Sequence, residues 1–321
     1  MKTVDTETSP HSLLLPKAQI MTDYITVKNL SRRTKIKIKF KELLSSLHLK
    51  GFPLPQKIKN KVKVFQQIQN SEKIFKGKKI VKCPETHLSW LHPMPSDQDL
   101  KSYYQGLFWD NKAVSYEIIG KNLDENCRAT HQIKMITNTV PDLKHRIKKT
   151  LEFGAGHGEI SYLMARLPNI QVNLLEPDKK FCNAHKEKGV VHSIFSNLNE
   201  VTSGYDLITA SHSLEHVTNI HNVLSKFHDI LNDEGLLFIE VPNCNESYFL
   251  NYKTDIPHTY FFNSQSISKL AKQHYFKVLS IHEIYQGKVL EKDEKLDPLK
   301  CADGGELRVL LEKIFVPNPI C

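Results

Sequence analysis

The sequence lacks paired cysteines and long hydrophobic runs. Its six cysteines are scattered along 321 residues without a C-x-x-C pair, which argues against a disulfide framework or a cysteine zinc site and favours a reducing compartment. Apolar runs such as Leu236–Ile239 are strand-sized, far short of the ~20 residues that span a bilayer. The first residues hold a three-leucine apolar core and no small-residue cleavage site, so we expect no signal peptide. We therefore expect a cytoplasmic protein without a membrane span, and no pattern indicates its oligomeric state.

Acidic residues are nearly missing from one part of the chain. Residues 28–82 hold 17 Lys and Arg against two acids, a local net charge of +15, whereas the whole chain carries +9. Two stretches there, KIKIKFK (35–41) and KIKNKVKVF (57–65), alternate lysine with apolar residues, which predicts strands with one lysine face. Three interpretations remain open: a solvated face, a surface for a polyanion such as RNA or an acidic carrier domain, or a membrane-surface role, which no basic helix favours.

Changes in hydrophobic periodicity, charge and aromatic content divide the chain into four parts. Residues 1–27 show no period and are predicted to be flexible, and residues 28–82 form the basic segment or small subdomain. Residues 83–149 are an aromatic-rich, helical lid segment, in which a short capped helix leads to Tyr103 and Tyr104. Residues 150–321 alternate strands with amphipathic helices, which predicts an α/β, Rossmann-like, doubly wound sheet covered on both faces. The strands are expected at 150–153, 172–178, 190–195, 205–210, 235–243, 277–284 and 307–313.

A glycine-rich stretch, LEFGAGHGE (151–159), follows the first of these strands. Gly154, Gly156 and Gly158 at the turn between a strand and a helix are typical of a backbone that passes close to a ligand. The third glycine of a dinucleotide fingerprint is missing, because Glu159 stands in its place. A pyrophosphate would be repelled by Glu159 and by Glu152 behind the loop. A cationic ligand without phosphate, such as S-adenosyl-L-methionine, tolerates both acids.

A second acid supports the same ligand. Glu176 ends the second strand in LLEPD, 18 residues after Gly158, where a carboxylate can accept both hydroxyls of a ribose. Each feature alone is weak. The combination of Glu152, the three glycines and Glu176 in one strand–helix–strand unit is more specific.

Four stretches together resemble the successive motifs of class I S-adenosylmethionine-dependent methyltransferases: LEFGAGHGE, LLEPD, YDLITASHSLEHV and LNDEGLLFIEVPN. Two more, residues 255–281 and HPMPSDQDLKSYY (92–104), are similar to a subset that includes sugar C-methyltransferases. The resemblance covers about residues 83–313 and implies a mainly parallel seven-stranded sheet with an antiparallel last strand. Those sugar enzymes usually carry an N-terminal cysteine zinc knot, of which this chain has only Cys83, so we expect no metal.

The resemblance also implies roles for single residues. The loop glycines with Ala155 would pass under the methionyl part and the adenosine, Glu152 would lie near the amino group, and Glu176, followed by Pro177, would hold the ribose. Asn197 stands where the family often has an acid near the adenine. Ser211 and His212 would line the side shared by cofactor and substrate.

The histidines after the fourth strand allow a rival interpretation. HSLEH (212–216) satisfies H-x-x-E-H, the inverted zinc-protease signature, and two histidines four residues apart can chelate zinc. The motif directly follows a predicted strand rather than lying inside a helix, which disfavours a protease. Histidines that only cap a turn remain a further alternative.

The predicted reaction is an in-line methyl transfer, in which positioning of donor and acceptor carries much of the rate. A hydroxyl or activated carbon acceptor needs a base, and histidine suits that task near neutral pH. The candidate catalytic residues are His258, then His216, then Tyr104, with core packing as the alternative for the tyrosine. We expect a small-molecule acceptor, a sugar or natural-product intermediate, methylated on oxygen or carbon, and no membrane partner. The alternatives are an RNA methyltransferase that uses the basic segment, although an N-P-P-[YF] motif is missing, and an inactive polyanion-binding protein.

Overall fold

The computed structural model describes residues 25–26, 75, 78–104, 116–121, 123–245, 248, 258–285, 288–289 and 305–315. The two lysine-alternating stretches, 35–41 and 57–65, lie outside the described residues, as do nearly all of residues 1–27 and most of the basic segment. In the described part of the chain, no helix has both the length and the apolar character needed to cross a membrane.

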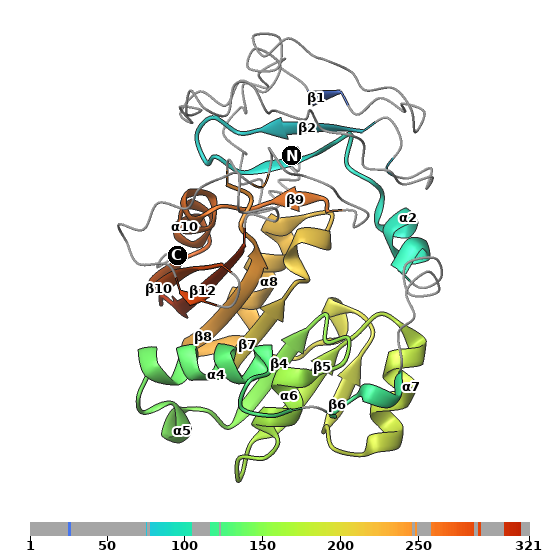
Figure 1. The fold of residues 1–321 in the computed structure, drawn as a ribbon, viewed down its shortest axis with the longest axis vertical. Coiled ribbons are helices and arrows are strands. Elements are labelled where there is room, and N and C mark those ends of the chain that lie inside the picture. Colours follow the sequence, from blue (N-terminus) through green and yellow to red (C-terminus); the bar gives the residue numbers. More distant parts are fainter. Residues whose placement is uncertain are drawn as a thin grey trace, which may run out of the picture.

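A twisted sheet of eight strands forms the centre of the molecule (Figure 1). Its order is β11-β10-β12-β8-β7-β4-β5-β6. The strands β6, β5, β4, β7 and β8 run parallel, and β12 is antiparallel to both of its neighbours. This arrangement confirms the predicted mainly parallel sheet with an antiparallel last strand, and the two-residue β11 adds an eighth strand at the edge. The strands are β4 (Lys149–Phe153), β5 (Gln171–Leu175), β6 (Ser193–Phe195), β7 (Tyr205–Ser211), β8 (Leu231–Pro242), β10 (Phe276–Tyr285), β11 (Lys288–Val289) and β12 (Glu306–Lys313).

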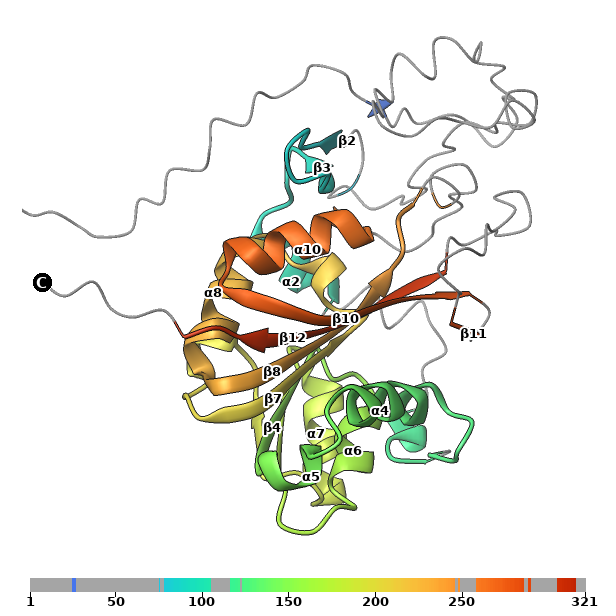
Figure 2. The ribbon, with the colours of Figure 1, turned by 90° about the vertical axis from the view of Figure 1, so that its left-hand side faces the viewer.

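Helices cover both faces of this sheet (Figure 2). One face carries α8 (Ile220–Ile230) and α10 (Ser264–Gln273), and the other carries α4 (Arg128–Thr139), α5 (Leu143–Arg146), α6 (Glu159–Met164) and α7 (Lys179–Lys188). The apolar residues that alternate with polar ones between positions 217 and 231, at the spacing of an amphipathic helix, extend beyond α8 at both ends. Asn219 caps α8 by accepting a hydrogen bond from the backbone of Asn222, and β8 begins at Leu231. A side chain that satisfies the free amides at the first turn fixes where a helix starts.

The sheet strands supply two separate cores because successive side chains point to opposite faces. On β8, Leu237 and Ile239 pack under α8 and α10, whereas Leu236 and Phe238 pack under α4 and α6. On β12, Leu307, Val309 and Leu311 join the first core and Leu310 joins the second. Polar residues on the second face therefore point toward α4.

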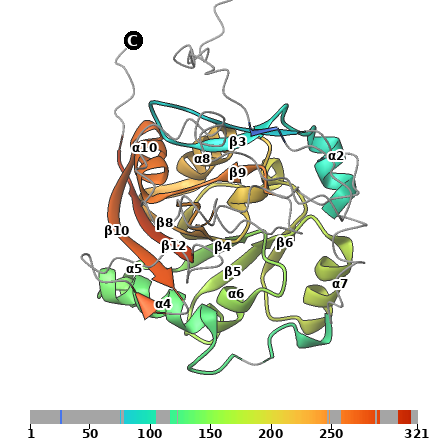
Figure 3. The same cartoon turned by 45° about the horizontal axis from the view of Figure 1, so that its top comes forward.

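A small antiparallel sheet lies across one end of the large sheet (Figure 3). Its order is β1-β2-β3-β9, formed by Ile25–Thr26, Lys79–Lys82, Ser89–His92 and Tyr260–Phe261. The helix α2 (Asp97–Ser102) follows β3, and Ser96 caps it by accepting a hydrogen bond from the backbone of Asp99. Phe75, Leu91, Leu100, Tyr103 and Phe261 form part of the buried core of this layer. The layer thus brings residues near 100 and near 260 to the same end of the large sheet.

Candidate functional site

The glycine loop follows β4 and is held by backbone hydrogen bonds at the end of β5. The amides of Gly154 and Ala155 donate to the carbonyl of Leu175 at 2.8 and 3.1 Å. Gly154 and Gly156 have φ angles of +67° and +52°, a region that is costly for residues with a side chain. Because β4 and β5 run parallel, their carboxyl ends lie at the same edge of the sheet.

The glycines of this loop serve different purposes. A Cβ on Gly154 would lie 2.6 Å from the Cβ of Ser213, and one on Gly158 would lie 2.9 Å from the ring of His185. Packing inside the protein therefore explains these two glycines. A Cβ on Gly156 would meet nothing within 4 Å. Open space at Gly156 is where a ligand can approach the bare backbone.

Glu176 contacts the loop directly. Its Oε2 accepts a hydrogen bond from the Gly156 amide at 2.7 Å, and its Oε1 accepts one from the Asp178 amide at 2.8 Å. Glu176 is 4% exposed, and burial raises the pKa of its carboxyl group to about 7 against the opposing effect of these hydrogen bonds. A carboxylate offers about four acceptor positions, so both oxygens can still accept hydrogen bonds from a ligand.

Glu152 fixes the start of α6. Its Oε2 accepts a hydrogen bond from the Ser161 amide at 2.9 Å. The residue is buried, and this burial raises the pKa of its carboxyl group to about 7 although the bonds from Ser161 favour the charged form. The carboxyl group therefore holds the loop and the helix in one arrangement. Its predicted position near the amino group of a cofactor stays a prediction.

The remaining residues predicted to bind cofactor lie at neighbouring strand ends. Ala155 is buried in the loop, and Pro177 is half-buried between β5 and α7. Asn197 is exposed after β6, where its side chain accepts a hydrogen bond from the Asn199 amide at 2.9 Å. Ser211 ends β7 and lies 3.3 Å from Glu240 Oε1.

His212 follows β7 in a left-handed conformation, with φ +48°. Its Nδ1 lies 3.3 Å from Glu215 Oε1, and its Nε2 lies 3.4 and 3.6 Å from Oε1 atoms of Glu240 and Glu306. Burial alone would lower the pKa of His212, but these three carboxylates raise it well above its ordinary value. His212 thus lies as a cation among three acids, of which Glu215 and Glu240 are buried.

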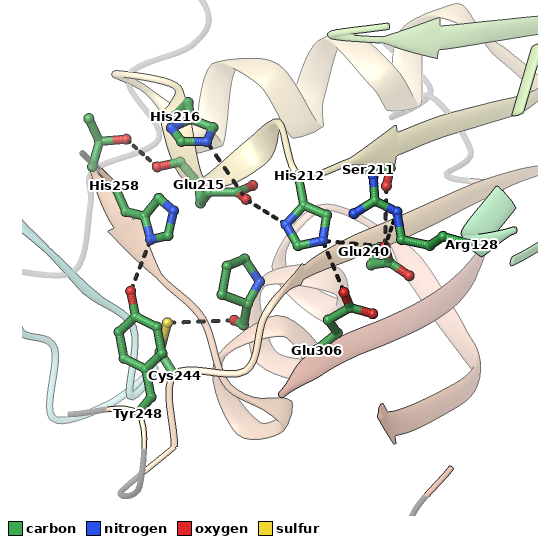
Figure 4. Close-up of polar contacts among 12 residues, drawn as sticks. Arg128, Ser211, His212, Glu215, His216, Glu240, Cys244, Tyr248, His258 and Glu306 are labelled. Atoms are coloured by element: carbon green, nitrogen blue, oxygen red, sulfur yellow. Dashed lines mark hydrogen bonds and ion pairs between the residues drawn. The ribbon is translucent and has the colours of Figure 1, made fainter. Parts of the chain in front are cut away.

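The three residues predicted to be catalytic lie next to this turn, and Figure 4 shows two of them, His216 and His258. The Tyr104 hydroxyl and His216 Nδ1 are hydrogen-bonded at 2.7 Å. The rings of His216 and His258 pack edge to face with centroids 5.0 Å apart. Tyr248 completes the group by hydrogen-bonding through its hydroxyl to His258 Nδ1 at 3.0 Å. We name Tyr104, Glu215, His216, Tyr248 and His258 the histidine cluster.

Glu215 lies at the centre of this cluster and was not singled out from the sequence. It is 1% exposed, and the only nearby signal was its place in H-x-x-E-H. Burial would raise the pKa of its carboxyl group, but His216, His212 and His258 hold the pKa at about 2. The backbone fixes its position, because its carbonyl accepts hydrogen bonds from the Thr259 amide at 2.7 Å and the Thr259 hydroxyl at 2.8 Å.

The H-x-x-E-H stretch does not form a zinc-protease helix. The strand β7 runs to Ser211, and residues Leu214–His216 make a single 3-10 turn. His212 and His216 face Glu215 from two directions, at 3.3 and 3.8 Å from its Oε1. The imidazole that packs against His216 is that of His258, which lies outside the H-x-x-E-H stretch.

A buried ion-pair network supports His212 from the side of α4. Glu240 is fully buried on β8, where its Oε2 accepts from Arg308 Nε. Its Oε1 accepts from Gln132 Nε2 at 2.7 Å and lies 3.6 Å from Arg128 Nε. The sequence signal for Glu240 was one acid inside an otherwise apolar strand, GLLFIEVP.

Comparison with known proteins gives the class of the domain. Residues 126–281 match the family model described as "Methyltransferase domain". No curated protein matches the chain by sequence. Among solved structures, the chain is similar to magnesium protoporphyrin IX methyltransferase from Synechocystis PCC 6803, with 11% identity, a TM-score of 0.49, and coverage of 68% of this chain and 100% of that one.

A second similar structure is 1,6-didemethyltoxoflavin-N1-methyltransferase from Burkholderia thailandensis. Its identity is 13% and its TM-score 0.49, with coverage of 74% of this chain and 96% of that one. The family match spans the glycine loop, Glu176 and the histidine cluster except Tyr104. Residues 126–281 therefore match a methyltransferase domain, which confirms the methyltransferase predicted from the sequence as the enzyme class.

Proposed function

We propose that this protein transfers the methyl group of S-adenosylmethionine to an oxygen or carbon atom of a small-molecule acceptor bound at the histidine cluster. The acceptor class is a sugar or natural-product intermediate. One observation carries the proposal: Gly154 packs directly against Ser213, so the loop for the cofactor and the turn that carries Glu215 and His216 are in contact.

The cofactor fits the chemistry of the loop. Open space lies beside Gly156, and Glu176 next to it keeps acceptor positions for the two hydroxyls of a ribose. Glu152 and Glu176 bring negative charge to the same edge of the sheet when they ionise. S-adenosylmethionine is a cation at its sulfonium and its ammonium and carries no phosphate, so this charge favours it.

The acceptor is activated on the other side of the Gly154–Ser213 contact. In the transfer, the acceptor atom attacks the methyl carbon in line with the carbon–sulfur bond, whose electron pair returns to sulfur. The acceptor's proton must leave, and His258 and His216 are the groups that act on it. Tyr104 hydrogen-bonds to His216 Nδ1 and orients that ring. Positioning of this kind can lower the barrier by ~7–11 kcal/mol.

The test separates cofactor binding from transfer. Calorimetry with S-adenosylmethionine measures the first, and transfer of radiolabelled methyl groups into a metabolite pool, followed by mass spectrometry of the product, measures the second. His258→Ala and Tyr104→Phe should keep the affinity for the cofactor within about threefold and slow transfer by at least ~100-fold and ~10-fold respectively.

The outcomes are distinct. Unchanged transfer in His258→Ala would remove that residue from the reaction. A wild-type protein that binds no S-adenosylmethionine would contradict the proposal as a whole and favour the alternative of a protein that has lost turnover.

A further inference from the structure

Glu215 is a buried carboxylate whose charge is balanced by histidines rather than by close hydrogen bonds. Neither side-chain oxygen has a hydrogen-bond partner among the residues that the structure describes. Its contacts to His212 Nδ1 and His216 Nε2 are ion pairs at 3.3 and 3.8 Å. A buried carboxylate is costly unless it is hydrogen-bonded, paired or bound to a metal. A metal ion between Glu215 and its histidines would give this carboxylate a direct bond in place of these long contacts.

Two imidazoles are arranged around the same carboxylate. One ligand atom from each of Glu215, His216 and His258 lies within 4.8 Å of the other two. Ligands of a tetrahedral zinc ion lie about 3.4 Å apart, given bonds of ~2.0–2.1 Å. A contraction of at most about 1.5 Å would therefore bring the three side chains to bonding geometry.

The outer contacts of the histidines suit metal ligands. His216 Nδ1 and His258 Nδ1 each hydrogen-bond to a tyrosine hydroxyl, from Tyr104 and Tyr248. Metal-binding histidines almost always donate a hydrogen bond from their second nitrogen, usually to a carboxylate, a backbone carbonyl or water, which fixes the tautomer and the ring orientation. Here the tyrosine hydroxyls lie in the place of that acceptor. His216 Nε2 faces Glu215, and Figure 4 shows the second ring nitrogen of His258 on the side of Glu215 and His216.

We propose that Glu215, His216 and His258 form a binding site for a divalent transition metal of the zinc class. Imidazole ligands select such ions, whereas Mg²⁺ prefers all-oxygen sites. This proposal departs from the expectation of no metal, which rested on missing cysteines. Three protein ligands leave a coordination position open, as in catalytic zinc sites.

The open coordination position narrows the chemical class of the methyl acceptor. This narrowing rests on the proposed function. A hydroxyl of the acceptor binds there, and the metal lowers its pKa so that its proton passes to water. The oxygen then forms the bond to the methyl carbon, and the carbon–sulfur bond breaks with its electron pair on sulfur. The two histidines thus act on the acceptor's proton through the metal, and the acceptor is an alcohol or phenol.

The other group of histidine and acids in the described part of the chain differs in its charge balance. His212, Glu240 and Glu306 also lie within 4.8 Å of one another. There, however, Glu240 already accepts from Arg308 and Gln132. Close hydrogen bonds from the protein therefore already satisfy that buried carboxylate, whereas the Glu215 oxygens have none among the described residues.

Cobalt(II) is a spectroscopic probe for this site. We would strip the full-length protein with a chelator, remove the chelator, and titrate CoCl₂ in the absence of cofactor. We expect a visible d–d band that saturates at one equivalent, is abolished by one equivalent of Zn²⁺ and is unaffected by excess Mg²⁺. Glu215→Gln and His216→Gln should weaken binding by about tenfold or more.

His274→Gln is the matched control. His274 belongs to another close histidine pair, with its Nε2 2.9 Å from His221 Nδ1, and this variant should bind Co²⁺ like the wild type. A wild-type titration without a saturable band would overturn the proposal, and so would a band that survives in Glu215→Gln but is lost in His274→Gln. Because the wild-type titration needs no variant, a misfolded variant, identified by circular dichroism, leaves the test decisive.

Calorimetry with S-adenosylhomocysteine on the metal-free protein keeps the two proposals apart. If the protein binds S-adenosylhomocysteine but shows no saturable Co²⁺ band, the metal site is overturned and the proposed methyl transfer is not. A Co²⁺ site without binding of this ligand overturns the proposed methyl transfer and supports the metal site.

Discussion

Gly156 offers a direct test of where the cofactor lies, by substitution with alanine. An alanine there adopts φ near +52°, and a left-handed conformation costs an L-residue roughly 1–2 kcal/mol. Alanine also stiffens the unfolded chain, which offsets up to about 1 kcal/mol. We expect Gly156→Ala to lose about 1 kcal/mol of stability, a fall in Tm of ~2–4 °C.

The effect on binding should be larger than the effect on folding. The new methyl group meets no protein atom within 4 Å, so it projects into the space that we assign to the cofactor. Overpacking by one methyl group costs about 1–3 kcal/mol, which weakens the affinity for S-adenosylhomocysteine roughly five- to 150-fold. Differential scanning fluorimetry measures the first quantity and calorimetry the second.

Gly189 provides the matched control. It ends α7 with φ +64°, and a Cβ there also meets nothing within 4 Å. Gly189→Ala should therefore show the same small fall in Tm and an unchanged affinity. If Gly156→Ala and Gly189→Ala bind S-adenosylhomocysteine equally well, the open space beside Gly156 is not the cofactor site, and the reasoning from the glycine loop fails.

Two further predictions concern buried charges. Burial raises the pKa of Glu152 from 4.5 to about 7. Between these two pH values the folded protein keeps a proton that the unfolded chain has released. The free energy of unfolding therefore falls as the pH rises from about 4.5 to about 7. Glu152→Gln should therefore raise Tm relative to wild type more at about pH 7.5 than at about pH 5; a difference independent of pH would contradict the raised pKa. Arg308→Met leaves Glu240 without its main partner and should cost ~3–5 kcal/mol in urea unfolding. A loss below about 1 kcal/mol would show that the ion pair does not stabilise the fold.

The sheet and the glycine loop were predictable because their signals are local. A short, mostly apolar run identifies a buried strand such as β7, and glycines between a strand and a helix identify the turn, from within about ten residues. The pattern could not show that Gly154 and Gly158 are required by packing. Their neighbours Ser213 and His185 lie 59 and 27 residues further along the chain, and only the closed fold brings them close.

The histidine cluster was predictable only in part, for the same reason. Tyr104, His216 and His258 were chosen singly, by type and by resemblance, and nothing in the sequence indicated that they share one place. Pairing of β3 with β9 and the hydrogen bonds from Thr259 to Glu215 assemble them. Tyr248 has no recognisable signal at all, because its role depends on the His258 nitrogen that it contacts.

The distribution of buried acids explains why this end of the sheet suits positively charged ligands. Glu152, Glu176, Glu215 and Glu240 are each at most 5% exposed, and burial of an unpaired carboxylate is expensive. Arginine and glutamine compensate Glu240 within the protein. Among the described residues, the donors to Glu152 and Glu176 are backbone amides and Ser161. The raised pKa of both carboxyl groups shows that burial outweighs these donors. A sulfonium and ammonium ligand near the loop would supply the positive charge that Glu152 and Glu176 lack. At Glu215 the neighbouring histidines already balance the charge, and a metal ion there would instead bond Glu215, His216 and His258 directly.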